Sequence, residues 1–290
     1  MSPTQRTIKY IAMGLGLLLA LGIISGILSA VVGVAGFFSD VQGSEQQMTT
    51  QIVRDFEDIT SLDVSHAAGK LEIKSGETFR VEAFNVDEGR FTCQRRDDGT
   101  LYIQDESIYH AFNIFNWNFG GNATPSIVIT LPAGTRLARA SIHLGAGETQ
   151  VEQLICDELK LECGAGSFRA DRMAADKVDF SGGVGEIRIE NMDFKDMTAK
   201  TGVGEVRLSG RLTGDSRVEC GVGELRLNLA DARSAYAISA KSGLGDIRID
   251  GEKISGELGD SAGAPNRLRL QGGVGAIRVQ FGQAADWQAN

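Results

Sequence analysis

Apolar and polar residues alternate along most of the chain after residue 59, and glycines interrupt the alternation at regular intervals. In the stretch 177–189, every second residue is apolar on both sides of Gly183-Val184-Gly185. Alternation with a period of two is typical of a strand that is buried on one face. The stretch therefore predicts two short strands joined at a Gly-x-Gly turn, with Ile187 and Ile189 facing inward.

The Gly-x-Gly phrase recurs seven times between Gly145 and Val279, and the first five copies, which begin at Gly145 and end with the one at Gly221, are evenly spaced. A constant period of about 20 residues is typical of a repeat architecture in which each unit covers the next. Glycine tolerates positive φ and leaves room for close approach of two backbones. The turn glycines are Gly145, Gly147, Gly164, Gly166, Gly183, Gly185, Gly202, Gly204, Gly221, Gly223, Gly243, Gly245, Gly273 and Gly275.

A repeat unit of this length, with two short strands, cannot bury its apolar face alone, whereas a stack of such units can. We therefore predict an all-β chain, a single-stranded β-solenoid of roughly 19-residue Gly-x-Gly coils. A phosphate-binding glycine loop would have to open a helix, and each of these turns opens a strand instead. Calcium-binding nonapeptide β-rolls are excluded because they require tandem nine-residue periods with aspartate.

The first part of the chain has a different pattern. Arg6 and Lys9 precede an uncharged apolar run at 10–39, which as a helix would be ~45 Å long, more than a ~30 Å hydrocarbon core requires. Positive charge before the span places the N-terminus in the cytoplasm. We predict a cytoplasmic N-terminus at 1–9, a transmembrane signal anchor at 10–39 and an extracytoplasmic remainder, in the cell membrane as a single-pass protein. A signal peptide cleaved near Gly33-Val34-Ala35 is the alternative.

The remainder divides by pattern into four parts. A polar linker spans 40–58, an irregular β start spans 59–134, regular repeats span 135–282, and a C-terminal cap or tail spans 283–290. In the irregular part, Ala67-Ala68-Gly69 looks like a degenerate repeat and Asp98-Gly99 like a hairpin turn. Strands are expected at 79–86, 91–95, 101–104 and 127–131. A polar loop at 252–266 separates the last coils, and the final coil is expected to end near Phe281.

An aromatic insertion at 108–122 breaks the repeat pattern. One interpretation is a cap that folds over the open strand edge at the membrane-proximal end. The other is an exposed patch for a partner or for the outer leaflet, because aromatic side chains of this number are unfavourable in water. The residues of this candidate interaction patch are Tyr109, Phe112, Phe115, Trp117 and Phe119.

Outward positions after the turns carry an acidic and a basic residue in successive repeats. Stacked like charges repel, and an adjacent column of opposite charge relieves this by roughly 0.2–1 kcal/mol per pair. This account needs no ligand; the alternative is a charged strip that binds an envelope polymer or a protein partner. The acidic column is Glu148, Glu186, Glu205, Glu224 and Asp246, and the basic column is Arg169, Arg188, Arg207, Arg226, Arg248 and Arg278.

The four cysteines do not form an obvious disulfide framework. Cys163 and Cys220 occupy the same inward position three coils apart, which is ~14 Å and beyond the ~7 Å limit for a bridge. We predict free, buried thiols. The chain has no Cys-x-x-Cys and three dispersed histidines, His66, His110 and His143, so neither a metal nor a cofactor is expected. Catalysis is not expected either, because the outward columns are nearly identical from coil to coil.

The net charge of the chain disfavours some classes of binding partner. Beyond the span, 38 acidic residues face 27 basic ones (29 less Arg6 and Lys9), so the exported part is near −11. An acidic surface disfavours nucleic acid and anionic membrane surfaces as partners.

The strand Ile127–Pro132, followed by serial Gly-x-Gly-Glu-Ile-Arg-Ile phrases behind one N-terminal span, resembles the bacterial putative-adhesin family over roughly 59–281. The resemblance implies an extracytoplasmic β-solenoid domain of a cell-envelope protein, in some members linked to envelope stress, and offers no catalytic residues. We therefore expect a membrane-anchored, non-catalytic binding, adhesion or envelope-stress-sensing module. A structural or carbohydrate-active β-helix protein of the envelope is the alternative.

Overall fold

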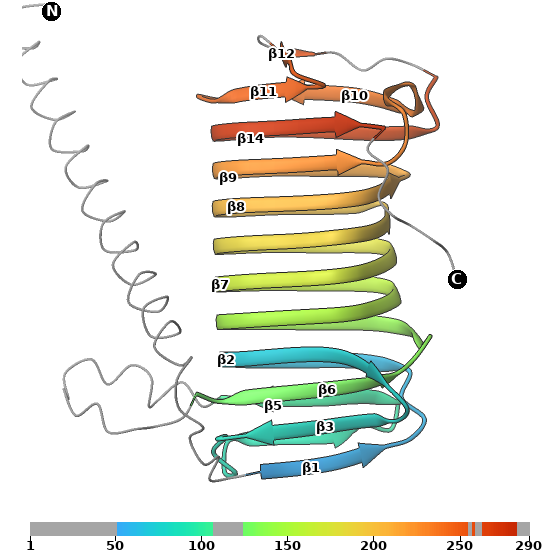
Figure 1. Ribbon diagram of the computed structural model, residues 1–290, viewed down its shortest axis with the longest axis vertical. Coiled ribbons are helices and arrows are strands. Elements are labelled where there is room, and N and C mark those ends of the chain that lie inside the picture. Colours follow the sequence, from blue (N-terminus) through green and yellow to red (C-terminus); the bar gives the residue numbers. More distant parts are fainter. Residues whose placement is uncertain (1–50, 107–123, 255–256, 259–262, 283–290) are drawn as a thin grey trace, which may run out of the picture. The chain divides into compact units, whose positions relative to one another are not determined.

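The computed structural model describes residues 51–106, 124–254, 257–258 and 263–282, all within one compact unit of the chain. These residues form a single 14-stranded sheet that winds into a stack of coils (Figure 1). For these residues the prediction of an all-β fold is confirmed. No helix in these ranges has the length and apolarity to cross a membrane, and the predicted anchor at 10–39 lies outside them.

The strands follow the chain with one short 3-10 turn, η3, among the described residues. Their bounds are β1 Gln51–Phe56, β2 Ser61–Gly76, β3 Phe79–Phe84, β4 Phe91–Arg95, β5 Thr100–Asp105, β6 Ser126–Pro132, β7 Arg136–Lys195, β8 Met197–Thr213, β9 Asp215–Leu229, η3 Arg233–Ala235, β10 Tyr236–Lys241, β11 Asp246–Ile249, β12 Glu252–Ile254, β13 Glu257–Leu258 and β14 Asn266–Phe281.

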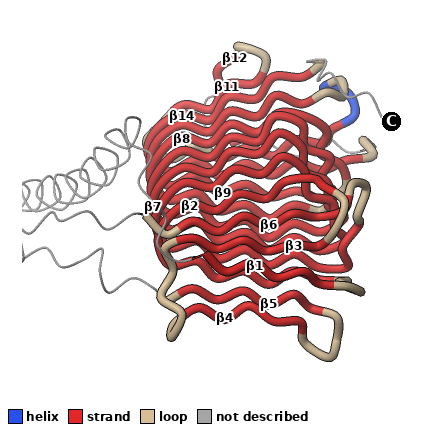
Figure 2. Tube along the Cα trace, turned by 60° about the horizontal axis from the view of Figure 1, so that its bottom comes forward, coloured by secondary structure: helices blue, strands red, loops and turns tan. Residues whose placement is uncertain are grey.

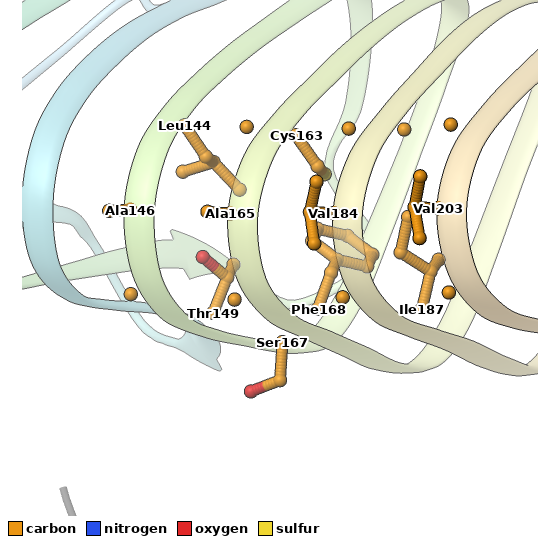
Figure 3. Close-up of a pocket in the computed structure, with 18 of the residues that line it drawn as sticks. Leu144, Ala146, Thr149, Cys163, Ala165, Ser167, Phe168, Val184, Ile187 and Val203 are labelled. Atoms are coloured by element: carbon orange, nitrogen blue, oxygen red, sulfur yellow. The ribbon is translucent and has the colours of Figure 1, made fainter. Parts of the chain in front are cut away.

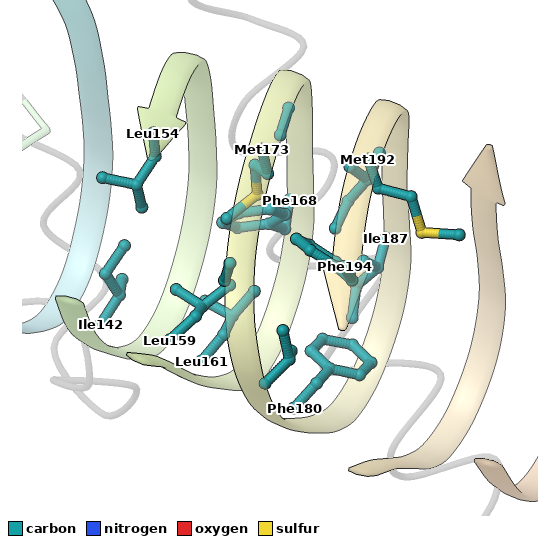
Figure 4. Close-up of a cluster of buried hydrophobic side chains, with 14 of the residues drawn as sticks. Ile142, Leu154, Leu159, Leu161, Phe168, Met173, Phe180, Ile187, Met192 and Phe194 are labelled. Atoms are coloured by element: carbon teal, nitrogen blue, oxygen red, sulfur yellow. The ribbon is translucent and has the colours of Figure 1, made fainter. Parts of the chain in front are cut away.

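Parallel pairing at an offset of one repeat holds the middle of the stack together. Val184 in β7 lies opposite Val203 in β8, which lies opposite Val222 in β9. The backbone stays extended through the Gly-x-Gly turns, so β7 is one 60-residue strand rather than a series of short ones. Alternation places one residue of every two inside, where the side chains of successive coils pack on one another (Figure 4). Phe168 and Phe194 are among the largest side chains that are fully buried there.

The N-terminal end of the stack changes from parallel to antiparallel pairing. β2 pairs in parallel with β7 on one side and with β5 and β6 on the other, and Gly69 lies opposite Gly147, as expected for a degenerate repeat. β4 then pairs antiparallel with β5 and β3 with β6, so the Asp98-Gly99 turn joins a hairpin as predicted. β4 and β5 lie at one end of the stack and β11 and β12 at the other (Figure 2).

The linker predicted at 40–58 needs a correction, because its last part contains β1. β1 pairs antiparallel with β3, and Arg80 Nε lies 2.7 Å from a carboxylate oxygen of Asp55 across this pair. The sequence of β1 alternates weakly and its burial is partial, so it is ordered by pairing with β3 rather than by its own pattern.

The order of the last coils in space also differs from the prediction. β14 lies between β9 on one side and β10 and β11 on the other, so Val274 is opposite Val222 and Ala276 is opposite Asp246. The repeat at Gly273 therefore precedes the repeat at Gly243 in the stack. The region expected to be a polar loop holds β12 and β13, which pair antiparallel with β11 and β10 and cover part of the last coil. The longer interval between the turns at Gly243 and Gly273 along the chain reflects this excursion.

Candidate functional site

The Gly-x-Gly turns of successive coils stack on one another at one corner of the coils. A Cβ added to Gly166 would lie 1.9 Å from the carbonyl oxygen of Gly147, and one added to Gly185 would lie 1.9 Å from that of Gly166. Both glycines also have positive φ, 133° and 146°. Side chains are excluded here on both grounds, so the corner is a line of backbone in direct contact.

The residue between the two glycines forms a second line at this corner, which we call the corner column. Four of its members are exposed: Val203 at 45%, Val222 at 46%, Val274 at 49% and Leu244 at 89%. Among the described residues, Val53 is the one other large hydrophobic side chain that is exposed. In spatial order the column is Ala68, Ala146, Ala165, Val184, Val203, Val222, Val274 and Leu244.

Sequence reasoning missed the corner column. The residue between the glycines sits where the period-two alternation breaks, so alternation assigns it to neither face. The available signal was that this position is Val or Leu in the last five copies along the chain.

A shallow groove runs along the half of the corner nearer β2, and we call it the corner groove. Figure 3 shows three rows of side chains along it, with Cys163 in the first, Ala165, Val184 and Val203 in the second, and Phe168 in the third. Its cavity volume is about 30 Å³. That is room for one or two water molecules and far below the several hundred Å³ of a typical small-molecule site. The groove therefore cannot enclose an organic substrate.

A buried polar pair lies at the β2 end of the corner groove. His66 Nδ1 is 2.9 Å from a carboxylate oxygen of Asp105, and the two residues are 3% and 1% exposed. They are opposite each other in the β2–β5 ladder, and His66 also lies opposite Leu144 of β7. His66 lines the groove, and its Nε2 has no hydrogen-bond partner among the described residues. Sequence reasoning identified His66 only as a dispersed histidine.

The structure places the two predicted charge columns side by side on the face that follows the corner. Arg169 pairs with Glu148 at 3.6 Å and with Glu186 at 3.2 Å, on the coils either side of its own. Its own coil has Ser167 at the acidic position, so Arg169 bridges the gap in the acidic column.

Further along the columns, pairing is mostly within a coil. Arg207 lies 2.7 Å from Glu205, and Arg226 lies 2.8 Å from Glu224. Arg278 also pairs with Glu224, and Arg248 lies 3.9 Å from Asp246. Arg188 differs, because its partner, Glu190, lies outside the acidic column. Half-exposed pairs of this kind contribute about 0–1 kcal/mol each.

All four cysteines are free thiols in the structure, with Cys93, Cys156 and Cys220 buried. Cys163 and Cys220 belong to one inward line of the ladder, with Gly182 and Thr201 between them. Burial raises the pKa of Cys93, Cys156 and Cys163 to about 12, so these thiols are protonated and weakly nucleophilic at neutral pH. Among the described residues, no group of three or more His, Cys, Asp or Glu could hold a metal ion.

The five aromatic residues of the predicted interaction patch lie outside the described residues. The described residues on either side show where this segment leaves and rejoins the sheet. Asp105 ends β5 opposite His66, and Lys70 N donates to Pro125 O at 2.9 Å just before β6 begins. Both points lie at the Gly-x-Gly corner.

Solved structures that resemble the chain include a putative cell adhesion protein from Clostridium sporogenes ATCC 15579 (16% identity, 80% of this chain, 99% of that chain, TM-score 0.33). A putative adhesin from Bacteroides fragilis NCTC 9343 is 15% identical, and the match covers 81% of this chain and 100% of that chain with a TM-score of 0.41. A putative adhesin from Parabacteroides merdae ATCC 43184 is 10% identical, and the match covers 80% of this chain and 95% of that chain with a TM-score of 0.37. No curated protein matches the chain.

The family model described as Toastrack DUF4097 matches residues 59–258, which is more than half of the chain. Its span falls within the region, 59–281, over which the sequence resembles adhesin-type envelope proteins. The chain belongs to the Toastrack DUF4097 family.

Proposed function

We propose that this chain is a membrane-anchored, extracytoplasmic β-solenoid that binds a partner in the cell envelope through the corner column, without catalysis. The supporting observation is that four of the five exposed large hydrophobic side chains among the described residues stack in this one column. A single exposed valine is ordinary on a protein surface. Four in successive coils, ~4.8 Å apart, make a continuous apolar line of the kind that marks an interaction site.

The chemistry of the corner favours binding over catalysis. The His66–Asp105 pair resembles the base and orienting carboxylate of a hydrolase, but such a pair needs a nucleophile within hydrogen-bond reach. The nearest thiol along the same inward line is Cys163, which is separated from His66 by Leu144 and so lies about two strand spacings, ~10 Å, away. Its pKa of about 12 opposes thiolate formation as well.

The proposed location rests on the sequence of the first forty residues. Arg6 and Lys9 before the uncharged run at 10–39 favour a cytoplasmic N-terminus and an exported domain. A reporter enzyme active only in the cytoplasm, fused after residue 290, should therefore be inactive. An active fusion would contradict the proposed topology without bearing on the corner column. If the partner is a surface polymer, the module serves adhesion. If the partner is an envelope protein, the module serves as a sensor.

The binding test uses the full chain and the variant Val222→Ser, Val274→Ser, Leu244→Ser. Both are incubated with purified cell-wall sacculi and, separately, with envelope membrane vesicles, and retention is measured by sedimentation. The parent chain should be retained by one of the two, and the triple variant should lose most of this retention. Its melting temperature should stay close to that of the parent, because the three side chains are 46%, 49% and 89% exposed.

Val53→Ser is the matched control, because Val53 is 46% exposed, like Val222, but lies on β1 and outside the column. It should bind like the parent. Equal retention of the triple variant and the parent would exclude the corner column as the binding surface. Equal losses in Val53→Ser and the triple variant would show nonspecific adsorption and would also contradict the proposal.

A further inference from the structure

We infer that the corner column of one chain packs on the corner column of a second copy, with the two stacks parallel, to form a homodimer. The contact line consists of the four exposed members, which are in spatial order Val203, Val222, Val274 and Leu244. A two-fold axis parallel to the stack sets each of these side chains against its own counterpart. The inference rests on the proposed function, because it names the partner of the same column.

The first argument is that the corner presents side chains and no free strand edge. Val222 lies opposite Val203 on one side and Val274 on the other, and Leu244 N donates to Gly273 O at 2.8 Å. Because the backbone here is paired from coil to coil, an extended peptide cannot add to it as a strand. A partner must instead cover apolar side chains that recur every ~4.8 Å, and the same line on a second copy has this spacing.

The second argument is the charge on either side of the line. Lys200 and Glu205 flank the turn of the β8 coil, on the two faces that meet at the corner, and Lys241 and Asp246 flank the last turn in the same way. In the part of the chain that the structure describes, neither lysine forms a salt bridge. The parallel two-fold axis sets the lysine-bearing face of one copy beside the acidic face of the other. Lys200 then meets Glu205, and Lys241 meets Asp246, twice each in the dimer.

Antiparallel packing of the same line is less favourable. It would set Lys200 beside Lys241 of the second copy and Glu205 beside Asp246. Like charges placed opposite one another are destabilising. Charged pairs at the rim of an interface determine orientation more than affinity, so they favour the parallel arrangement.

One contact of like charge remains in the parallel arrangement, between Glu219 of one copy and Glu224 of the other. Each carboxylate already has a cationic partner in its own chain, because Glu219 lies 2.8 Å from Arg217 and Glu224 lies 2.8 Å from Arg226. Their mutual repulsion is reduced accordingly, and the two Lys–acid contacts outweigh it.

The third argument is the direction from which each chain enters its stack. β1 is the terminal strand of the sheet order, and the anchor predicted at 10–39 precedes it in sequence. Two copies anchored in one membrane are expected to have their β1 ends on the same side, as a parallel pair requires. Four apolar side chains with a charged rim form a small interface, so association in solution is weak. Confinement to one membrane raises the effective concentration of the second copy.

Cysteine cross-linking of the full chain in membranes tests the inference. Val203→Cys and Leu244→Cys, each introduced alone, should give a disulfide-linked dimer on mild oxidation, detected by non-reducing electrophoresis. The two positions lie three steps apart, ~14 Å, so an antiparallel pair, which has a single centre, cannot link both. Val53→Cys is the matched control, because Val53 is 46% exposed and Val203 is 45% exposed, but Val53 lies outside the column. It should give no dimer, and neither should the parent chain with its four native thiols.

A charge exchange tests which faces meet. Lys200→Glu sets acidic residues opposite each other across the dimer, and Glu205→Lys sets lysines opposite each other. In the Leu244→Cys background, each variant alone should lower the cross-linked fraction about twofold or more. Coexpression of the two variants with different tags should restore the cross-link as a mixed dimer, because opposite charges then face each other.

Several outcomes would overturn the inference. They are no cross-link at either position, a cross-link at only one of them, equal cross-linking in Val53→Cys, and no mixed dimer in the charge exchange. If melting temperatures show that Val203→Cys does not fold, Val222→Cys replaces it. Retention of the parent chain by sacculi or vesicles without any cross-link would reject the second copy and leave the proposed function with a different partner.

Discussion

His66 Nδ1 lies 2.9 Å from a carboxylate oxygen of Asp105, and the two side chains face each other across adjacent parallel strands inside the stack. Further along the same inward line, the side chains are Leu144 and Cys163. The polar pair therefore stands at the first coil of an otherwise apolar or small-residue line. Each partner is buried because the other is there.

Asp105→Leu should destabilise the protein by about 1–3 kcal/mol, because it leaves the buried Nδ1 of His66 unpaired. The double variant His66→Leu, Asp105→Leu should recover much of this loss, because an apolar pair would then continue the line of Leu144. Urea unfolding of the parent, both single variants and the double variant measures the coupling. Strictly additive losses would show that the two side chains do not act as a pair.

The regular part of this molecule could be predicted from sequence because its contacts repeat. An offset of one repeat sets the neighbours of Val203, and the same offset applies to Arg207 and to each glycine of the turn. One correct period therefore gave the inward faces, the stacked turns and the adjacent charge columns at once.

The parts that the sequence analysis missed lie where the period ends or where the alternation breaks. His66 and Asp105 are paired by a ladder that skips from β2 to β5, and no periodicity links them. The place of β14 between β9 and β11 depends on which of two similar repeats stacks better on β9, which is a non-local choice. Val222 and Val274 sit at the break in alternation, so their exposure could not be read from the pattern.

Gly185→Ala should destabilise the protein by roughly 2–4 kcal/mol, because a Cβ there meets backbone and φ is 146°. Gly89→Ala is the control, because the nearest atom to an added Cβ is 3.4 Å away and φ is not in the left-handed region. Its effect should stay within about 0.5 kcal/mol. Thermal and urea unfolding of the two variants test this, and similar losses at both sites would argue against backbone contact at the corner.

The raised pKa values of the buried thiols predict that the free energy of unfolding declines at alkaline pH. Burial raises the pKa of Cys93, Cys156 and Cys163 to about 12, whereas an unfolded cysteine titrates near ~8.5. The folded state holds these protons more tightly, so the stability from protonated thiols is complete below about pH 8.5 and is lost as the pH rises toward 12. Urea unfolding between pH 7 and 11 should show this decline, and Cys93→Ala should reduce its slope.

The same thiols should react with a disulfide reagent slowly in the folded chain and fully after denaturation without reductant. Thiol titration of the denatured, unreduced chain should find all four, including Cys163 and Cys220. A Cys163–Cys220 cross-link within one chain, detected by mass spectrometry, would contradict the ladder that places Gly182 and Thr201 between them.

Removal of one whole repeat should leave a shorter folded stack. Deletion of 183–201 joins Gly182 to Gly202, and Gly182 lies opposite Thr201, so the chain resumes in register one coil further on. Each coil contacts its neighbours mainly, so the loss should be limited to one unit and one interface. Deletion of 183–192 instead joins Gly182 to Asp193, which removes the Gly-x-Gly turn and moves Phe194 from the core to the corner position of Val184. Circular dichroism and urea unfolding should show a cooperative transition for the first deletion and loss of the transition for the second. Equal losses in both would refute the repeat register on which the corner column, the charge columns and the glycine stack depend.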